Sequence, residues 1–243
     1  MSLPVHHVPS VSGRSVGDEV EVTGDEAHHA VAVRRLRVGE SVVLTDGVGT
    51  RATGVVTETG KRVFSVSLSA VDLIERPTPA LVVVQALPKG DRGELAVEVL
   101  TEIGAELIVP WAAERSVAVW KGERAVKSHA RWVATAREAA KQARRDWFPE
   151  VAPLATTAQV IELVRQADQA VALHEGATAP LPAPTGDLIV LIVGPEGGLG
   201  DEEVAAFSTA GAVIARLGTE VLRTSTAGVA AASALLAQTP RWA

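Results

Sequence analysis

Two runs of apolar residues constrain the fold more than any other feature of this sequence. Leu81–Ala86, broken only by Gln85, and Leu188–Val193 have the length of strands and show no alternation of apolar with polar residues. Such runs are typical of strands that are covered on both faces, which occur mainly in parallel sheets packed between helices. We therefore expect an α/β fold from residue 81 onward.

Predicted helices and further strands alternate around these two runs. We expect strands over 107–109, 170–173 and 213–217, and helices over about 94–103, 123–145 and 158–166, from 201 and from 226. In the first helix Leu95, Val99 and Ile103 have helical spacing, and Gly104 is placed to end it. Strands that alternate with helices predict a mostly parallel sheet.

The N-terminal part has a different pattern. Apolar residues alternate with serines over residues 64–70, which predicts a strand with one buried face. Further strands are expected over 41–45 and 52–57, with glycine-containing turns beside them. Short strands at this spacing predict a small β-barrel. His28–Arg37 is expected to be a short helix that docks on the barrel and points its arginines outward.

Pro77 and Pro79 separate the two patterns. Two prolines in alternate positions force an extended chain and remove backbone donors, so neither a helix nor a central strand continues through them. We therefore expect one domain over 1–74 and a second over 78–243.

Several classes of protein are excluded by composition. The 243 residues include no cysteine, so disulfides, thiolate metal sites and cysteine nucleophiles are ruled out. The six histidines have no metal-ligand spacing, and we expect no metal. No apolar run approaches the ~20 residues that cross a bilayer, and the N-terminus lacks the regions of a secretory signal. We expect a cytoplasmic protein that does not enter a membrane.

Positive charge is concentrated in one stretch of a net-acidic chain. The whole chain has a net charge of −6, whereas residues 115–145 hold nine basic and two acidic residues, a net charge of +7. Such a stretch is either a solvated helix face or a footprint for a polyanion such as nucleic acid. Trp147 and Phe148 at its end are candidates for stacking on bases, whereas Trp132 is expected to anchor the helix to the core.

Three unusual segments follow the ends of predicted strands. Gly194–Gly198 comes directly after the second apolar run, Leu217–Ala227 joins a strand to a helix, and Leu173–Glu175 ends its own strand. Ligands of open α/β sheets bind outside the carboxyl ends of the strands, and glycine lets the backbone approach a ligand closely. We expect the three segments to form one pocket with Arg223 projecting into it. An ordinary turn or a helix cap is the alternative for each segment taken singly.

A longer set of motifs runs through nearly the whole chain in a fixed order. It consists of His29, Val33–Arg35, Gly39, Asp46–Gly47, Gly49, Leu87–Lys89, Glu102–Gly104, Pro110, Glu114–Ser116, Arg131–Trp132, Glu138–Ala140, Gln142, Arg145, Pro149–Val151, Gly194–Gly198, Asp201–Glu203, Gly211, Leu217–Gly218 and Leu222–Thr224. In these motifs the chain resembles the bacterial 16S ribosomal RNA uridine-N3 methyltransferase family of the SPOUT superfamily. Ser225 departs from the pattern, since the family has a glutamate there.

The resemblance implies a PUA-like RNA-binding β-barrel over 1–74 and a SPOUT methyltransferase domain over 78–243 with a C-terminal trefoil knot. It also implies S-adenosylmethionine as cofactor, 16S ribosomal RNA or the small ribosomal subunit as partner, and a homodimer. The expected cofactor contacts are Leu173, His174, Glu175, Val193, Gly194, Pro195, Glu196, Gly197, Gly198, Leu217, Gly218, Leu222, Arg223, Thr224, Thr226 and Ala227. The expected RNA contacts are His28, His29, Arg34, Arg35, Arg37, Arg131, Arg144 and Arg145.

For such an enzyme the uracil N3 must lose its proton before it attacks a methyl group. We expect Arg223 to stabilise the charge that develops on O2 and O4. Glu196 or Glu175 is the candidate base, and orientation of the two substrates is expected to supply much of the rate effect.

A ribose 2′-O-methyltransferase of the same superfamily is one alternative, although it usually carries an asparagine that Leu222–Ser225 lacks. A non-catalytic RNA-binding assembly factor is another, and it would leave the glycine-rich strand ends without a role.

Overall fold

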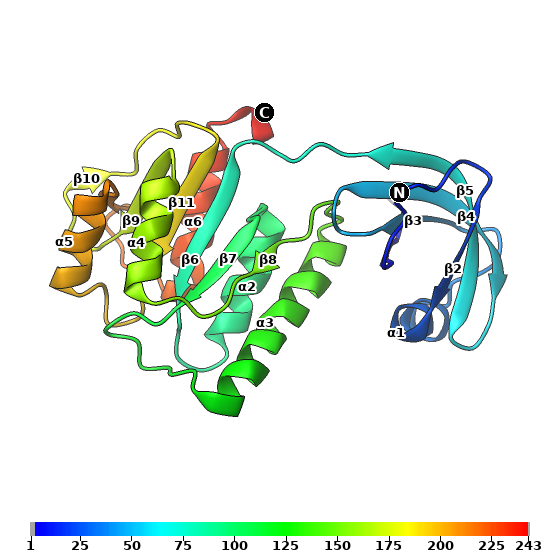
Figure 1. The fold of residues 1–243 in the computed structure, drawn as a ribbon, viewed down its shortest axis with the longest axis horizontal. Coiled ribbons are helices and arrows are strands. Elements are labelled where there is room, and N and C mark those ends of the chain that lie inside the picture. The colour runs from blue at the N-terminus through cyan, green and yellow to red at the C-terminus, as the bar shows by residue number, and fades with distance from the viewer. Residues whose placement is uncertain (1–2, 243) are drawn as a thin grey trace. The chain divides into compact units, whose positions relative to one another are not determined.

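The computed structural model of the protein describes residues 3–242, which divide into two compact units. The first unit runs to Arg76 and also includes Lys141–Phe148. The second consists of Pro77–Ala140 and the chain from Pro149 onward. Each unit has a sheet of its own (Figure 1). The short segment 141–148 therefore belongs to the first unit, whereas the expected division assigned all residues from 78 onward to the second domain.

The sheet of the first unit is curled and has five strands. They are β1 (Val5–His7), β2 (Glu19–Thr23), β3 (Ser41–Thr45), β4 (Thr50–Thr59) and β5 (Val63–Leu73), in the order β1-β3-β4-β5-β2. β1 pairs with β3 in parallel, and the other neighbours are antiparallel. Phe64, Val66 and Leu68 of β5 are buried in the core that the sheet encloses, which confirms the predicted alternation.

The helix predicted over His28–Arg37 is wrong in its position. Helix α1 spans Gly24–His28 and continues as one π-helical turn, η1 (His29–Val33). Arg35 has a φ of +58°, a left-handed conformation that a helix does not accommodate. Leu36 then folds back and is buried. The arginines after η1 consequently lie on a loop and not on a helix face.

The sheet of the second unit is parallel throughout, as predicted. Its strands are β6 (Ala80–Ala86), β7 (Leu107–Trp111), β8 (Glu150–Val151), β9 (Gln169–Leu173), β10 (Ala179–Pro180), β11 (Leu188–Val193) and β12 (Val213–Arg216), in the order β10-β12-β9-β11-β6-β7-β8. The two apolar runs are neighbours in the sheet, paired from Leu188 with Ala80 to Val193 with Gln85.

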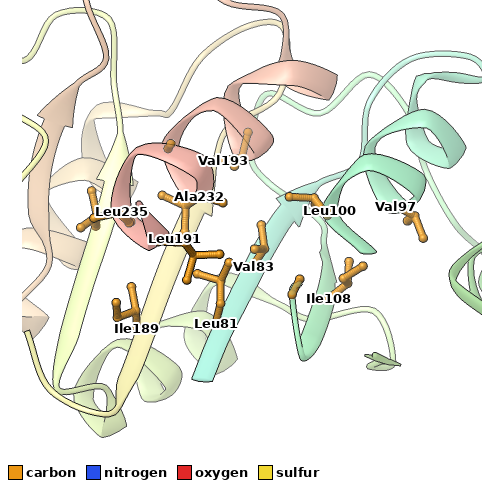
Figure 2. Packing of buried hydrophobic residues seen from close by; sticks show 14 of the residues in the cluster. Leu81, Val83, Val97, Leu100, Ile108, Ile189, Leu191, Val193, Ala232 and Leu235 are labelled. Carbon is orange, nitrogen blue, oxygen red and sulfur yellow. The ribbon is translucent and has the colours of Figure 1, made fainter. Parts of the chain in front are cut away.

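Helices cover both faces of this sheet, which explains why its central strands are apolar throughout. The helices are α2 (Arg92–Ile103), α3 (Gly122–Gln142), α4 (Thr157–Gln166), α5 (Asp201–Ala210) and α6 (Thr224–Leu236), followed by the 3-10 turn η2 (Pro240–Trp242). Leu81, Val83 and Leu191 pack with residues of α2, α3 and α6, as Figure 2 shows for Leu100 and Leu235. The alternate residues Val82 and Val84 pack on the other face with residues of α4 and α5.

Helix boundaries and faces show where local patterns were misleading. Helix α2 begins at Arg92, and it buries Ala96, Val97 and Leu100, while the predicted face residue Leu95 is 44% exposed. Gly104, with a φ of +107°, ends the helix as predicted.

Three other corrections concern α3, α6 and β10. Helix α3 ends at Gln142, three residues before the predicted end, and α6 begins at Thr224, two residues before the predicted start. Strand β10 lies in a segment for which no strand was expected. The trefoil knot stays a prediction. None of the helices within residues 3–242 is long and apolar enough to span a membrane.

Candidate functional site

A cavity lies where β9, β11 and β12 end, as the sequence predicted. Parallel neighbours place their carboxyl ends at one edge of a sheet, so the segments that follow these strands converge there. The cavity measures about 310 Å³. Its lining consists of Arg92, Leu173, His174, Glu175, Val193, Gly194, Pro195, Glu196, Gly198, Leu199, Arg216, Leu217, Thr219, Glu220, Val221, Leu222, Arg223, Thr224 and Ala227. Of the predicted cofactor contacts, the structure leaves Gly197, Gly218 and Thr226 outside this lining.

The wall after β11 is fixed by a chain of hydrogen bonds. The Thr224 hydroxyl donates to the carbonyl oxygen of Gly194 at 2.6 Å and accepts from Gln85 Nε2 at 3.1 Å. Gln85 is 1% exposed, and its amide also donates to the carbonyl of Ala86. An unpaired buried amide or carbonyl is costly, so these bonds hold β6, β11 and the start of α6 in one arrangement.

Glu196 ties the same wall to the loop that precedes α2. Its Oε1 accepts the backbone N–H of Lys89 at 3.0 Å and lies 3.7 Å from Arg92 Nη1. The Glu196 side chain is 28% exposed. The carboxylate therefore lines the cavity, while its Oε1 already accepts a hydrogen bond from the Lys89 backbone.

Two neighbouring glycines of this wall have different surroundings. A Cβ on Gly197 would lie 3.1 Å from Cβ of Arg115, so this glycine lets the Arg115 loop approach and does not face the cavity. A Cβ on Gly198 would meet no atom within 4 Å, and its φ of +71° disfavours any side chain. Gly198 thus presents bare backbone to the cavity.

The wall after β12 is more exposed. Val221 is 76% exposed and Leu222 is 39% exposed. Arg223 is the N-cap of α6, and its carbonyl oxygen accepts the N–H groups of Thr226 and Ala227. Its guanidinium has no hydrogen-bond or ion-pair partner within residues 3–242. The backbone of Arg223 is therefore held at the start of α6, while its side chain is a cation at the rim of the cavity with no partner among the described residues.

The cavity presents both signs of charge beside apolar surface. Arg92, Arg216 and Arg223 line it together with three glutamates, of which Glu175 belongs to the wall after β9. The Thr219 hydroxyl donates to Glu220 at 2.9 Å and lowers the pKa of that carboxyl. A ligand with a flat apolar part and a zwitterionic part suits such a lining. No cluster of three possible metal ligands occurs in the described part of the chain.

The predicted RNA contacts are exposed or half-buried, and one of their cations is already paired with a carboxylate. His28, His29, Arg34, Arg35 and Arg37 are exposed in the first unit, and Arg144 is exposed as well. Arg145 is half-buried. In the second unit Arg131 is exposed, and its guanidinium pairs with Glu94 Oε1 at 3.1 Å.

Part of the basic stretch has a structural role within the first unit. Lys141 Nζ lies 2.7 Å from Glu26 Oε2, and His6 Nδ1 lies 3.1 Å from Glu26 Oε1. Burial by itself raises the pKa of Glu26, but hydrogen bonds and charges from His6 and Lys141 outweigh it and lower the pKa to about 2. This ion pair binds segment 141–148 to α1 and β1.

Trp147 and Phe148 do not offer free faces to bases. Trp147 Nε1 donates to the carbonyl of Ile74 at 2.9 Å, and its ring fills the space beside Gly49, where a Cβ would lie 2.3 Å from Cζ2. Phe148 packs in the same way on Gly47. Both rings are half-buried and pack on glycines of the first unit. Trp132, by contrast, is 3% exposed and anchors α3 as predicted.

Several residues that line the cavity or support its wall were not predicted from the sequence. Arg92 stands three residues beyond the Leu87–Lys89 motif, and Gln85 is the one polar residue of an apolar run. That polar interruption was a usable signal, because a polar side chain inside a buried strand needs a partner. Leu199 and Arg216 lie directly beside predicted pocket segments, and Thr219, Glu220 and Val221 lie within the predicted segment Leu217–Ala227 but were not among the expected contacts.

Two family models match this chain. The one described as an RNA methyltransferase domain matches residues 75–236. The other, described as an RNA methyltransferase PUA domain, matches residues 22–68.

Named relatives and solved structures are similar over nearly the full length. The chain is 43% identical to ribosomal RNA small subunit methyltransferase E of Mycobacterium tuberculosis over 91% of this chain and 87% of that protein. It is 31% identical to the protein of the same name from Bacillus subtilis over 90% of each. The Neisseria gonorrhoeae protein of that name, solved bound to S-adenosylmethionine, has 28% identity and a TM-score of 0.85 over 97% of this chain and 98% of its own. A methyltransferase of Legionella pneumophila with bound S-adenosylmethionine has 27% identity and a TM-score of 0.84 over 98% of each chain.

Proposed function

Because the chain belongs to the RNA methyltransferase family whose members carry a PUA domain, we propose that it methylates N3 of a uridine in 16S ribosomal RNA, with S-adenosylmethionine as donor. The cavity at the ends of β9, β11 and β12, with the unpaired cation Arg223 at its rim, carries this proposal. Relatives named as small-subunit ribosomal RNA methyltransferases support the substrate. A cytoplasmic location and a homodimer are also part of the proposal. The proposed substrate supports the location, and the family resemblance supports the homodimer.

The residues of the cavity fit S-adenosylmethionine. When bound, this molecule supplies an activated methyl group. Leu173, Leu217 and Leu222 provide apolar surface for an adenine, and the bare backbone at Gly198 allows close approach. Glu175 and Arg216 offer partners for the two charges of an amino acid.

The predicted cofactor contacts that do not line the cavity would support its walls without touching the ligand. Gly197 lets Arg115 pack behind the wall. Thr226 donates a hydrogen bond to the carbonyl of Arg223 and so supports the start of α6. Gly218, with a φ of +81°, sets the course of the wall after β12.

Arg223 is the proposed catalytic residue. Uracil N3 becomes a nucleophile when its proton leaves, and negative charge then spreads onto O2 and O4. A guanidinium that is not neutralised by a protein carboxylate can stabilise that charge without first breaking an ion pair. Glu196 is the proposed acceptor for the N3 proton, with Oε1 already hydrogen-bonded to Lys89. Glu175 is the alternative acceptor.

RNA is proposed to bind through exposed and half-buried cations of each unit. His28, His29, Arg34, Arg35 and Arg37 follow one another along α1, η1 and the loop after it. Arg131, Arg144 and Arg145 belong to the basic stretch. Phosphate contacts of this kind supply affinity that is independent of sequence and falls with salt.

The test is mass analysis of nucleosides from unmodified small-subunit RNA incubated with the protein and methyl-labelled S-adenosylmethionine. We expect the label in 3-methyluridine. Label in a 2′-O-methylated nucleoside would favour the ribose methyltransferase alternative. Binding of RNA without transfer of label would favour an assembly factor.

A further inference from the structure

A second cavity adjoins the first and has no assigned occupant. It measures about 570 Å³ and lies between the loop that starts α2 and the segment after β7. Its lining is Lys89, Gly90, Asp91, Arg92, Leu95, Val117 and Glu196. Arg92 and Glu196 line both cavities, so the two cavities meet at this pair.

The surface of the second cavity combines apolar walls with cations. Leu95 is 44% exposed and Val117 is 68% exposed, and both present large aliphatic side chains to solvent. Lys89 and Arg92 stand at the same cavity. Asp91 and Glu196 are its acidic residues, and the Glu196 carboxylate is engaged by Arg92 and by the Lys89 N–H. The charges of the lining balance, and Arg92 is already paired with Glu196. The Lys89 ammonium has no ion pair within residues 3–242, so it is the cation available to an anionic group of an occupant whose apolar face lies against Leu95 and Val117.

We propose that this second cavity receives the target nucleotide, a uridine 5′-phosphate unit of RNA, with its base between Leu95 and Val117 and its anionic groups toward Lys89 and Arg92. This inference rests on the proposed function, because the nucleotide must lie next to the methyl donor. The shared wall of Arg92 and Glu196 meets that requirement. Glu196 is then also a positioning residue, since it fixes the Lys89–Arg92 loop.

The test uses Val117→Asp in the full-length protein. The aspartate places a carboxylate where a phosphate and an apolar base are to bind, so we expect kcat/KM for unmodified small ribosomal subunits to fall about tenfold or more. The affinity for S-adenosylmethionine should stay within about twofold, because Val117 does not line the first cavity. Val117 is exposed, so folding should be preserved.

Val16→Asp is the matched control. Val16 is 67% exposed and is the same residue type, but it belongs to the first unit. We expect full activity from this variant.

Lys89→Gln is a second test, because Lys89 lines the second cavity and not the first. It should lower kcat/KM for RNA and leave donor affinity unchanged.

Three results would overturn the inference. Equal activity of Val117→Asp, Val16→Asp and the parent would show that the cavity does not hold the nucleotide. A change of oligomeric state in Val117→Asp, seen by sedimentation, would show that the cavity takes a second copy of the chain. A parent protein that binds the donor but transfers no methyl group would refute the proposed function, and this inference with it.

Discussion

The two units position their candidate ligand contacts in opposite ways. In the first unit the arginines after η1 lie exposed on a loop, and Arg35 adopts a left-handed conformation. In the second unit the wall after β11 is held by hydrogen bonds from Thr224 and through the carboxylate of Glu196. Affinity for a polyanion requires cations near a surface, whereas group transfer requires defined orientation. The proposed function therefore assigns affinity for RNA to the first unit and orientation of the reacting groups to the second.

Replacing Arg223 by lysine should have the largest effect. The lysine keeps the charge but loses the planar fork, so single-turnover methylation should fall by about 10²–10³, while donor and RNA affinities change little. Rapid-quench measurement with labelled donor, together with calorimetry, separates these quantities. Full turnover in this variant would exclude the catalytic role. Equal losses of stability and donor affinity would instead indicate a structural role.

Thr224→Val should weaken the fixed wall. The valine leaves the Gly194 carbonyl without its donor, a loss of about 1–3 kcal/mol, so donor affinity should fall on the order of tenfold. Thr209→Val is the control, because the Thr209 hydroxyl is exposed and donates to the carbonyl of Ala205 at 2.8 Å, outside the cavity lining. Calorimetric titration of both variants checks the expectation. If the two variants behave alike, the wall does not depend on the Thr224 bond.

Charge reversal in the first unit should change RNA affinity and not chemistry. Arg34→Glu combined with Arg37→Glu should weaken RNA binding several-fold and lower the slope of log affinity against log salt by about 2. The single-turnover rate at saturating RNA should match the parent. Filter binding over a range of salt concentrations measures the slope. A lower rate at saturating RNA would break the proposed division between the units.

The smallest effect at neutral pH is expected for loss of the Glu26 ion pair. The contribution of this ion pair to stability is instead measured by lowering the pH. The folded-state pKa of Glu26 is about 2, below its ordinary value of 4.5. The stability that this carboxylate contributes is therefore complete above about pH 4.5 and is lost as the pH falls toward 2. Hydrogen exchange of β1 and α1 should accelerate over this range in the parent. In Glu26→Gln the acceleration should be absent, and exchange should be faster already at neutral pH.

The elements with strong local patterns were predictable from the sequence. The apolar runs of β6 and β11 follow from burial on both faces, and the end of α2 follows from Gly104. The meeting of the three strand-end segments follows from parallel topology. None of these predictions requires knowledge of a distant contact.

The remaining features depend on contacts between residues far apart in the chain. The start of α6 at Thr224 coincides with a hydroxyl that bonds to Gly194 and Gln85. The position of Arg92 depends on Glu196, and the packing of Trp147 depends on Gly49. Each of these partners is separated by tens of residues or more, so periodicity and turn signals do not report them. Gly197 lies outside the cavity lining because of such a contact, since it faces Arg115.

The most direct test of the account is the hydrogen-exchange footprint of S-adenosylmethionine on the full-length protein. We expect protection over 173–175, 193–199 and 216–227, the segments that line the first cavity, with no change over residues 24–37 of the first unit. Protection that falls mainly in the first unit, or saturated binding that leaves all three segments unchanged, would contradict the assignment of this cavity as the donor site.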